Sequence, residues 1–441
     1  MSNPSFRKSR FCAAFVVVVA AALLALPAMA GSQARIVRLS DVQGSVQIDK
    51  NTGQGFERAF LNLPITQGMK LQTRDNARAE IEFEDGSTLR LTPNTTVEFT
   101  ELGTSDSGRH TSVVNIGEGL VYVNWIGRSK DQFVIEFARE KVEIEREAHF
   151  RVGTSVTTAE VGVFKGNLQV AGPTGTVEVG KNKMASFDSA DNDKATLAKL
   201  DKDPLDSWDK QSIQYHEEYA SNNSSPYGYG NSDLSYYGGY QFIPGYGLMW
   251  QPYFTGIGWD PFLDGAWSFY PGAGYMFVSA YPWGWLPYRY GNWAFVPGFG
   301  WMWQPGYWNG YVTTPRYSGT LPAGFRPPVA PQGTISTVIV GRGELASTTT
   351  PGHLVVSRGS AGLGIARGSI SNLAHLNGQV SKTGFADAKS APQFAANGSR
   401  SMGGNMSAGH AGHSSIGSMG AGHTGSSVSA GHASGGGSGH H

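Results

Sequence analysis

The chain has 441 residues, and its 60 Gly and 22 Pro residues exceed average usage. Only 15% of the residues are charged and 12% are aromatic, a composition that excludes a long charged helical bundle. The 34 basic and 34 acidic side chains cancel, so the chain lacks the positive charge that a nucleic-acid-binding protein needs. The composition argues against a single compact enzyme-like domain and against a nucleic-acid partner.

The first 30 residues have the order of a secretory signal peptide. Three basic residues precede an apolar run at 11–26, and a triplet of small residues ends at Ala30. We expect cleavage after Ala30, which places the mature protein in the periplasm or outer cell envelope. If the segment stays uncleaved, it anchors the protein in the inner membrane, and only then do we expect membrane contact. Because Cys12 is the only cysteine, no disulfide or thiolate metal site is expected in the mature chain.

Residues 31–200 alternate between apolar and polar side chains. Ala77, Ala79 and Ile81 illustrate a period of two, and Asp85-Gly86 forms a turn dipeptide before the next run. This pattern is typical of half-buried antiparallel strands, and we expect roughly ten to twelve of them in a β-sandwich or β-roll.

A single helix is expected to follow these strands. Asp203 is a suitable N-cap and Pro204 a suitable first helical residue. We expect this helix to dock on the sheet through one face, which carries Leu205, Trp208, Ser212, Tyr215 and Tyr219.

The β zone also contains an ordered set of turn and strand motifs. They are Gly68-x-x-Leu71-x-Thr73, the run from Ala77 to Thr95 with Asp85-Gly86-Ser87 and Pro93-Asn94, Gly117-x-Gly119-x-Val121, and Val163-x-x-Gly166-x-Leu168-x-Val170. Over residues 36–190 this set resembles a FecR-type periplasmic domain. In the iron-dicitrate regulators such a domain senses a periplasmic signal, and a cytoplasmic anti-sigma segment relays it. Only ten residues precede the apolar run here, so we expect the fold without that relay segment.

The segment 238–312 contains 26 aromatic residues, nine of the 11 tryptophans and only three charged residues. One pattern, aromatic-x-Phe-x-Pro-Gly-x-Gly-x-Met-aromatic, begins at Tyr240 and recurs at Trp267 and Trp293. A constant period predicts repeated small units, each with two short strands around a Pro-Gly turn. The segment resembles Trp-, Pro- and Gly-rich repeats of uncharacterised function that follow FecR-like domains in exported bacterial proteins.

The repeats suggest which rings form a core and which remain free. Residues two apart on a strand share a face, so we expect one continuous core stripe. Its members are Tyr240, Phe242, Trp267, Phe269, Trp293 and Phe295. Trp259 and Trp285 lie on the intervening turns, where we expect them to be exposed and to stack on a sugar ring. The alternative is that every ring belongs to the core.

Candidate catalytic and metal-binding residues are few. Asp260 and Asp264 have the spacing of a glycosidase acid and base, but each also belongs to an ordinary turn dipeptide. The histidines outside the tail that fall in expected strands or helix, His110, His149 and His216, are expected on the surface or as hydrogen-bonded core residues. Six other histidines occupy a Gly/Ser-rich tail at irregular spacing, and we expect a solvated tail with no metal site and no cofactor.

We therefore expect a non-catalytic exported protein that binds or scaffolds an envelope polysaccharide or an envelope protein. The alternative is a periplasmic sensor of the FecR type that works with a sigma factor and an outer-membrane receptor, and a glycosidase is a third reading. The expected segments are a signal peptide (1–30), a FecR-like β domain (31–200), helix and linker (201–237), aromatic repeats (238–312), a weakly structured Gly/Pro-rich region (313–394) and a disordered tail (395–441).

Overall fold

A computed structural model describes residues 35–127, 131–220, 225–256, 258–306, 308, 311–333, 335–341, 347–350 and 352–391. The expected signal peptide and the expected tail lie outside these residues. No helix among the described residues has the length and apolar character needed to cross a membrane. The described residues are 45% strand and 12% helix, which confirms a mainly β protein.

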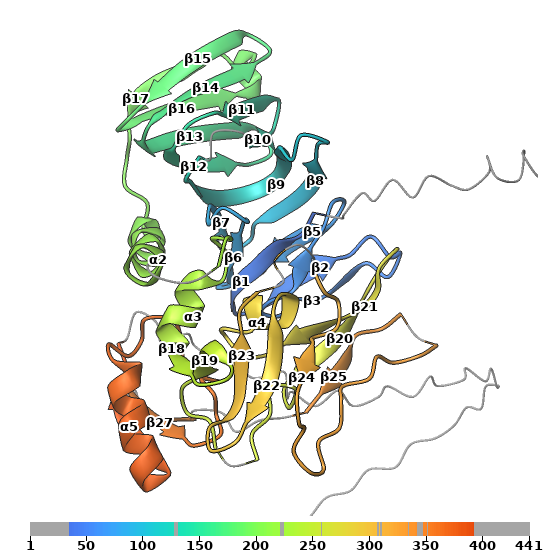
Figure 1. Ribbon diagram of the computed structural model, residues 1–441. Coiled ribbons are helices and arrows are strands. Elements are labelled where there is room, and N and C mark those ends of the chain that lie inside the picture. Colours follow the sequence, from blue (N-terminus) through green and yellow to red (C-terminus); the bar gives the residue numbers. More distant parts are fainter. Residues whose placement is uncertain are drawn as a thin grey trace, which may run out of the picture. The chain divides into compact units, whose positions relative to one another are not determined.

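Seventeen strands between residues 37 and 199 form two facing sheets (Figure 1). The strands are β1 Val37–Gln43, β2 Val46–Asp49, β3 Phe56–Arg58, β4 Pro64–Ile65, β5 Lys70–Thr73, β6 Arg78–Glu82, β7 Thr88–Leu91, β8 Thr96–Thr104, β9 His110–Trp125, β10 Gln132–Phe137, β11 Glu140–Ile144, β12 Ala148–Thr154, β13 Thr158–Lys165, β14 Asn167–Gly172, β15 Gly175–Gly180, β16 Lys183–Asp188 and β17 Thr196–Lys199. Hydrogen bonding gives the order β4-β1-β6-β7-β9-β12-β13-β16-β17 in the first sheet and β3-β2-β5-β8-β9-β10-β11-β14-β15 in the second.

This arrangement confirms the expected sandwich, although the strands outnumber the expected ten to twelve. The additional strands are short edge segments such as β3 and β17, and every residue of β17 is exposed. Such segments have no apolar face toward the core, so alternation cannot reveal them.

The long strand β9 belongs to both sheets. Its first half pairs with β8 and β10 in the second sheet, and from Gly119 onward it pairs with β12 in the first. Gly119 has a φ of +104°, and a Cβ there would lie 2.6 Å from Thr95 Cα and 2.8 Å from Asn94 O. The chain therefore changes sheet at a position that only glycine occupies without strain.

The core lies between the two sheets. Phe133 of the second sheet lies 4.8 Å from Trp125 and 5.1 Å from Phe83 of the first, measured between ring centroids. On β6, Ala79 and Ile81 are fully buried in this core. Their neighbours on the opposite face of the first sheet are charged and are also buried, so a further layer covers that face.

Four helices lie beyond the sandwich in the described part of the chain: α2 Asp206–Tyr219, α3 Asn231–Tyr237, α4 Leu286–Arg289 and α5 Leu373–Thr383. A short 3-10 turn spans Ser189–Asp191. The predicted helix is α2, but its N-cap is Leu205, so the prediction of Asp203 as N-cap and Pro204 as first helical residue is wrong. Asp203 instead caps the preceding turn, where it accepts a 2.7 Å hydrogen bond from Leu205 N. The other three helices had no sequence prediction.

Each aromatic repeat folds as a hairpin, as its pattern predicts. The hairpins are β18 Gly238–Ile243 with β19 Gly247–Pro252, β20 Gly265–Tyr270 with β21 Gly274–Ser279, and β22 Asn292–Val296 with β23 Gly300–Gln304. Their turns share a backbone hydrogen bond across Pro-Gly, for example from Tyr246 N to Ile243 O at 3.0 Å. Gly245 has a φ of +83°. Proline followed by glycine at positive φ makes this a type II turn.

The three hairpins do not form one sheet, so the predicted continuous stripe is wrong. The first and third pair through Trp250 and Trp303, while the second joins a different sheet. Phe242 is 74% exposed and therefore lies outside the core. Instead, one cross-strand row spans the first and third copies, and its members are Tyr240, Trp250, Trp303, Trp293 and Tyr317.

The second hairpin is separated from the other two because it contacts the β sandwich. Lys50 Nζ donates 3.0 Å hydrogen bonds to Ser268 Oγ and Phe269 O, and Tyr270 Oη donates to Pro64 O at 2.9 Å. The sequence period shows that the three hairpins are alike, but it does not show which hairpins pair with each other in the structure.

The remaining strands lie in the segment expected to be weakly structured. They are β24 Tyr317–Ser318, β25 Val338–Val340, β26 Ser347–Thr350, β27 His353–Ser357 and β28 Phe385–Lys389. Strands β26, β27 and β28 form a separate three-stranded sheet.

Two glycines of β9 test the sheet change. We expect Gly119→Ala to lower the free energy of unfolding by about 2–4 kcal/mol, because a side chain at positive φ would also collide with backbone atoms. Gly117→Ala is the control, since its Cβ would meet nothing closer than Thr96 O at 3.7 Å, and its effect should stay within about 1 kcal/mol. Denaturant unfolding of both variants measures the difference, and equal effects would contradict this account of Gly119.

Candidate functional site

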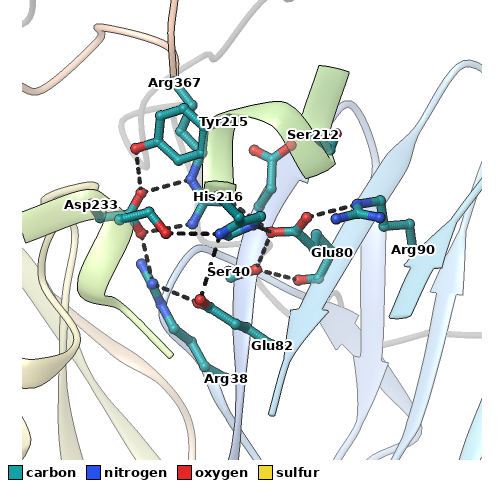
Figure 2. Close-up of polar contacts among 12 residues, drawn as sticks. Arg38, Ser40, Glu80, Glu82, Arg90, Ser212, Tyr215, His216, Asp233 and Arg367 are labelled. Carbon is teal, nitrogen blue, oxygen red and sulfur yellow. Dashed lines mark hydrogen bonds and ion pairs between the residues drawn. The ribbon is translucent and has the colours of Figure 1, made fainter. Parts of the chain in front are cut away.

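The outer face of β1, β6 and β7 holds a buried network of charged side chains. Cross-strand pairing sets Arg38 opposite Glu82 and Glu80 opposite Arg90, with each side chain directed away from the sandwich core. All four are 2% exposed or less. Helices α2 and α3 and the segment around Arg367 supply the partners that cover them (Figure 2).

Glu80 lies at the centre of this network. Its Oε1 accepts hydrogen bonds from Ser40 Oγ at 2.7 Å and Arg367 Nη1 at 2.7 Å, and it lies 2.9 Å from His216 Nε2. Its Oε2 accepts from Arg90 Nε at 2.8 Å. One carboxylate thus joins β1, β7, α2 and a segment 287 residues away in sequence.

Asp233 provides a second centre in the first turn of α3. Arg367 donates to both of its oxygens, at 2.8 and 2.7 Å, in a bidentate pair. Tyr215 Oη donates to it at 2.8 Å, and Arg38 Nη1 lies 2.6 Å away. The aromatic region is therefore joined to the sandwich by a buried carboxylate from its first helix.

Arg38 connects the network with the second aromatic hairpin. Its Nη2 donates to Pro282 O at 3.0 Å, and its Nε donates to Asn62 Oδ1. Asn62 Nδ2 in turn donates to Ser279 O at 3.1 Å and to Tyr281 O at 2.8 Å. Polar contacts thus continue from the charged face to the end of β21.

Helix α2 brings a third buried carboxylate, Asp209. It accepts from Arg90 Nη1 at 2.9 Å and lies 2.7 Å from His149 Nε2. The predicted docking of this helix on the sheet is confirmed, although part of the docking face is ionic rather than apolar.

Burial and charge shift the carboxyl pKa values in opposite directions. Burial alone would raise the pKa of Glu80, but His216, Arg90 and Arg367 outweigh it and hold that pKa well below its usual value. Arg367 and Arg38 likewise lower the pKa of Asp233 against the effect of burial. For Glu82 burial prevails, with Asp233 adding to it, and the pKa is raised. Glu80 and Glu82 share one face of β6, yet ionisation is favoured for Glu80 and disfavoured for Glu82.

Ser232, His216 and Glu80 form a line of the kind found in nucleophilic catalysis. His216 Nδ1 lies 2.8 Å from Ser232 Oγ, and its Nε2 faces Glu80. Ser232 is only 2% exposed, and its hydroxyl is already hydrogen-bonded to His216. The arrangement serves as a hydrogen-bonded link between α2, α3 and β6.

The first sheet also carries a depression of about 680 Å³, which lies over β12, β13 and β16 and away from the face that α2 and α3 cover. Most of its walls are small or hydroxyl side chains. Glu160 lines it, and burial, together with Asp201 and Asp203, raises the pKa of Glu160 despite Arg151. Its lining combines the hydroxyls of Thr154, Ser155 and Ser186 with the Glu160 carboxylate, so it offers polar groups to a small ligand.

The two predicted sugar-stacking residues are buried. Trp259 is 6% exposed and Trp285 is fully buried, so the premise that their turns leave them exposed is wrong. Trp259 Nε1 donates to Tyr281 Oη at 2.9 Å, and Trp285 packs 5.3 Å from the Tyr229 ring. The segments between hairpins fold back onto the aromatic cluster, since there are too few aliphatic residues to fill it. Their binding role stays a prediction.

The other candidate residues have local partners. Asp260 accepts from Phe262 N at 2.8 Å, as its turn dipeptide predicts, and Asp264 accepts from Tyr281 Oη at 3.1 Å. His149 and His216 are partly buried and paired with carboxylates, as expected of hydrogen-bonded core residues. The described residues contain no group of three or more His, Cys, Asp or Glu side chains arranged to hold a metal ion.

The sequence does not reveal the charged network, because its strand residues fit the ordinary polar half of an alternating strand and its other members lie far away in the sequence. One signal was present: Arg38, Glu80, Glu82 and Arg90 carry opposite charges on strands that are adjacent in a sandwich. That signal predicts cross-strand pairs but not their burial.

Glu80 and Glu82 provide a matched test of the network. We expect Glu80→Gln to lower the free energy of unfolding by about 3–5 kcal/mol at neutral pH, because it leaves buried cations uncompensated. Glu82→Gln should cost less than about 1.5 kcal/mol, since the ionised form of Glu82 is already disfavoured.

The pH dependence of unfolding adds a second check on these variants. A lowered folded-state pKa contributes stability that is lost as the pH falls through it, so the deficit of Glu80→Gln should shrink in acid. Glu82 has a raised pKa, so its ionised form lowers the free energy of unfolding at neutral pH. This destabilisation disappears as the pH falls and the carboxyl becomes protonated. Equal deficits for the two variants across the pH range would contradict the assignment.

Two family models match separate parts of the chain. Residues 69–169 match the family model described as FecR protein, and residues 231–327 match that of a family of unknown function (DUF6600). No curated protein matches the sequence.

Two crystal structures of a candidate anti-sigma factor from Parabacteroides distasonis are similar to part of the chain. The first shares 19% identity over 32% of this chain and 63% of its own, with a TM-score of 0.27. The second shares 18% identity over 34% of this chain and 71% of its own, with a TM-score of 0.28. This chain thus spans less than two thirds of the first of these structures. From the two family matches, the chain carries a FecR domain followed by a region of the family of unknown function (DUF6600).

Proposed function

We propose that the chain is a non-catalytic protein of the cell envelope that senses a signal through its FecR domain and transmits it to a protein partner. The FecR match supports the envelope location and the sensing role. The observation that carries the proposal is the buried network, because its ion pairs join the FecR strands to the aromatic region. These pairs are buried, so water cannot take the place of a charged partner that moves away.

The network makes the two regions respond together. Moving α3 away from β1 would separate Asp233 from Arg38 and would break an ion pair that is fully buried. A cost of about 3–5 kcal/mol for such a break favours concerted movement over independent movement. A ligand in the depression over β12, β13 and β16 would act on the same sheet that carries the network. We infer that the partner is an envelope protein or a sigma factor.

A genetic experiment separates sensing from passive scaffolding. The gene is deleted and complemented with the native chain, with Arg367→Gln, which weakens the link to Glu80 and Asp233, or with the exposed control Arg146→Gln. We expect deletion to change a small, defined set of transcripts, native protein and Arg146→Gln to restore it, and Arg367→Gln to fail.

Two measurements complete this test. Circular dichroism establishes whether Arg367→Gln is folded, and its abundance in the envelope establishes whether it is exported. An unfolded variant would show a reduced protein level in the envelope. Envelope fragility on deletion without any defined transcript change would contradict sensing and favour scaffolding.

A second candidate function, binding of an envelope polymer, is favoured by apolar side chains exposed at two hairpin turns. Phe242 is 74%, Leu248 45% and Tyr246 38% exposed at the turn of the first hairpin, and Phe299 is 48% exposed at the turn of the third. Strands β19 and β23 pair antiparallel, so these turns lie at opposite ends of their shared sheet. No charged residue occurs at 238–259 or 290–312, so each turn suits an uncharged polymer such as a glycan.

Binding at these turns is testable with whole protein. We expect the native chain to sediment with purified peptidoglycan, and the double variant Phe242→Ser, Phe299→Ser to lose at least about tenfold in affinity. Val329→Ser is the control, because Val329 is a 77% exposed apolar residue outside the turns. Absence of native binding, or equal binding by the double variant, would remove the polymer from consideration.

A further inference from the structure

Arg289, the last residue of α4, is a buried cation without an anionic partner. It is 1% exposed. Its Nη1 donates only a long, 3.4 Å hydrogen bond to Val312 O, and its Nε has no hydrogen-bond partner. Among the described residues it forms no ion pair, whereas Arg38, Arg90 and Arg367 each pair with carboxylates.

Two further donors near Arg289 are also unsatisfied. Its Cζ lies 5.4 Å from the Trp285 ring centroid and 5.1 Å from that of Tyr311, and these two rings lie 6.2 Å apart. Trp285 Nε1 and Tyr311 Oη are both buried, and neither has a hydrogen-bond partner in the described part of the chain. Three buried donor groups that lack acceptors among the described residues therefore belong to side chains that pack against one another.

The two aromatic rings compensate this charge only in part. Cation–π contacts stabilise a guanidinium, but they do not accept hydrogen bonds from its Nε at the ring edge. The acidic residues of the same region, Asp260 and Asp264, have their own donors in Phe262 N and Tyr281 Oη. Burial of an arginine with an unused N–H edge is unfavourable unless an acceptor is present.

We propose that Arg289, Trp285 and Tyr311 form a binding site for the carboxylate group of a small organic acid. A carboxylate is planar, accepts about four hydrogen bonds and matches the paired N–H groups of a guanidinium edge. The indole N–H and the phenol O–H supply donors beyond that edge. The site is distinct from the charged network and from the exposed turns, so it does not depend on the proposed sensing function.

The experiment measures stabilisation of the full chain by anions of equal ionic strength. Unfolding temperatures are compared in sodium acetate, sodium chloride and sodium phosphate, after refolding in each salt so that the buried site can fill. We expect acetate to raise the unfolding temperature by several degrees more than chloride does. Arg289→Gln should abolish this difference, while Arg109→Gln, which removes an exposed arginine, should preserve it.

A spectroscopic readout and a milder variant make the test decisive. In arginine-labelled protein, one Nε–H resonance that is absent from Arg289→Gln should shift on titration with acetate. If that variant does not fold, Tyr311→Phe removes only the hydroxyl donor and should weaken the apparent acetate affinity about fivefold to tenfold. An acetate response that equals the chloride response, or one that survives in both variants, overturns the proposal. A response to phosphate but not acetate that requires Arg289 overturns the assignment to a carboxylate.

Discussion

The structure depends on one constraint: charged side chains on the outer face of β1, β6 and β7 must be covered without losing their partners. A two-layer sandwich can leave such a face in water at no cost. Once α2 and α3 cover it, each carboxylate needs several donors, and Glu80 has them from Ser40, Arg90, His216 and Arg367. The helices therefore carry matching polar groups, and their positions are fixed by hydrogen-bond geometry as well as by apolar contact.

That constraint also explains the unusual chemistry of the aromatic region. Its strands contact the sandwich and one another, so they expose few positions that need charge, and large rings fill the space between thin sheets. Asp233, on the helix that precedes the first hairpin, carries the charge that the network requires, and Arg367, 134 residues later in the chain, pairs with it. Low charge in 238–312 thus reflects how much of the region is covered on both faces.

Patterns within short stretches of the sequence predicted single strands and single turns. Alternation at Ala77, Ala79 and Ile81 identified the core face of β6, and each Pro-Gly dipeptide identified a hairpin turn. Pairing between distant strands was beyond such rules, because Trp250 and Trp303 are 53 positions apart and any of three similar hairpins could have joined them. Burial of Glu80 and Glu82 was equally hidden, since an exposed and a covered polar face have the same alternation.

The fate of Trp285 gives the same lesson for sites. A tryptophan beside proline in a connecting segment is expected at the surface. Here the segment folds inward as α4 and places the Trp285 ring near Tyr229 and Arg289, while smaller and more weakly marked residues at the turns, Phe242 and Phe299, reach solvent. A short connection between hairpins has few ways to cross an aromatic cluster, and covering the cluster buries its largest ring. Phe242 lies in the next-to-last pair of its ladder, opposite Leu248, and Phe299 lies in the turn beyond the last pair of the third hairpin, so both rings extend from the ends of hairpins that have no further layer to contact.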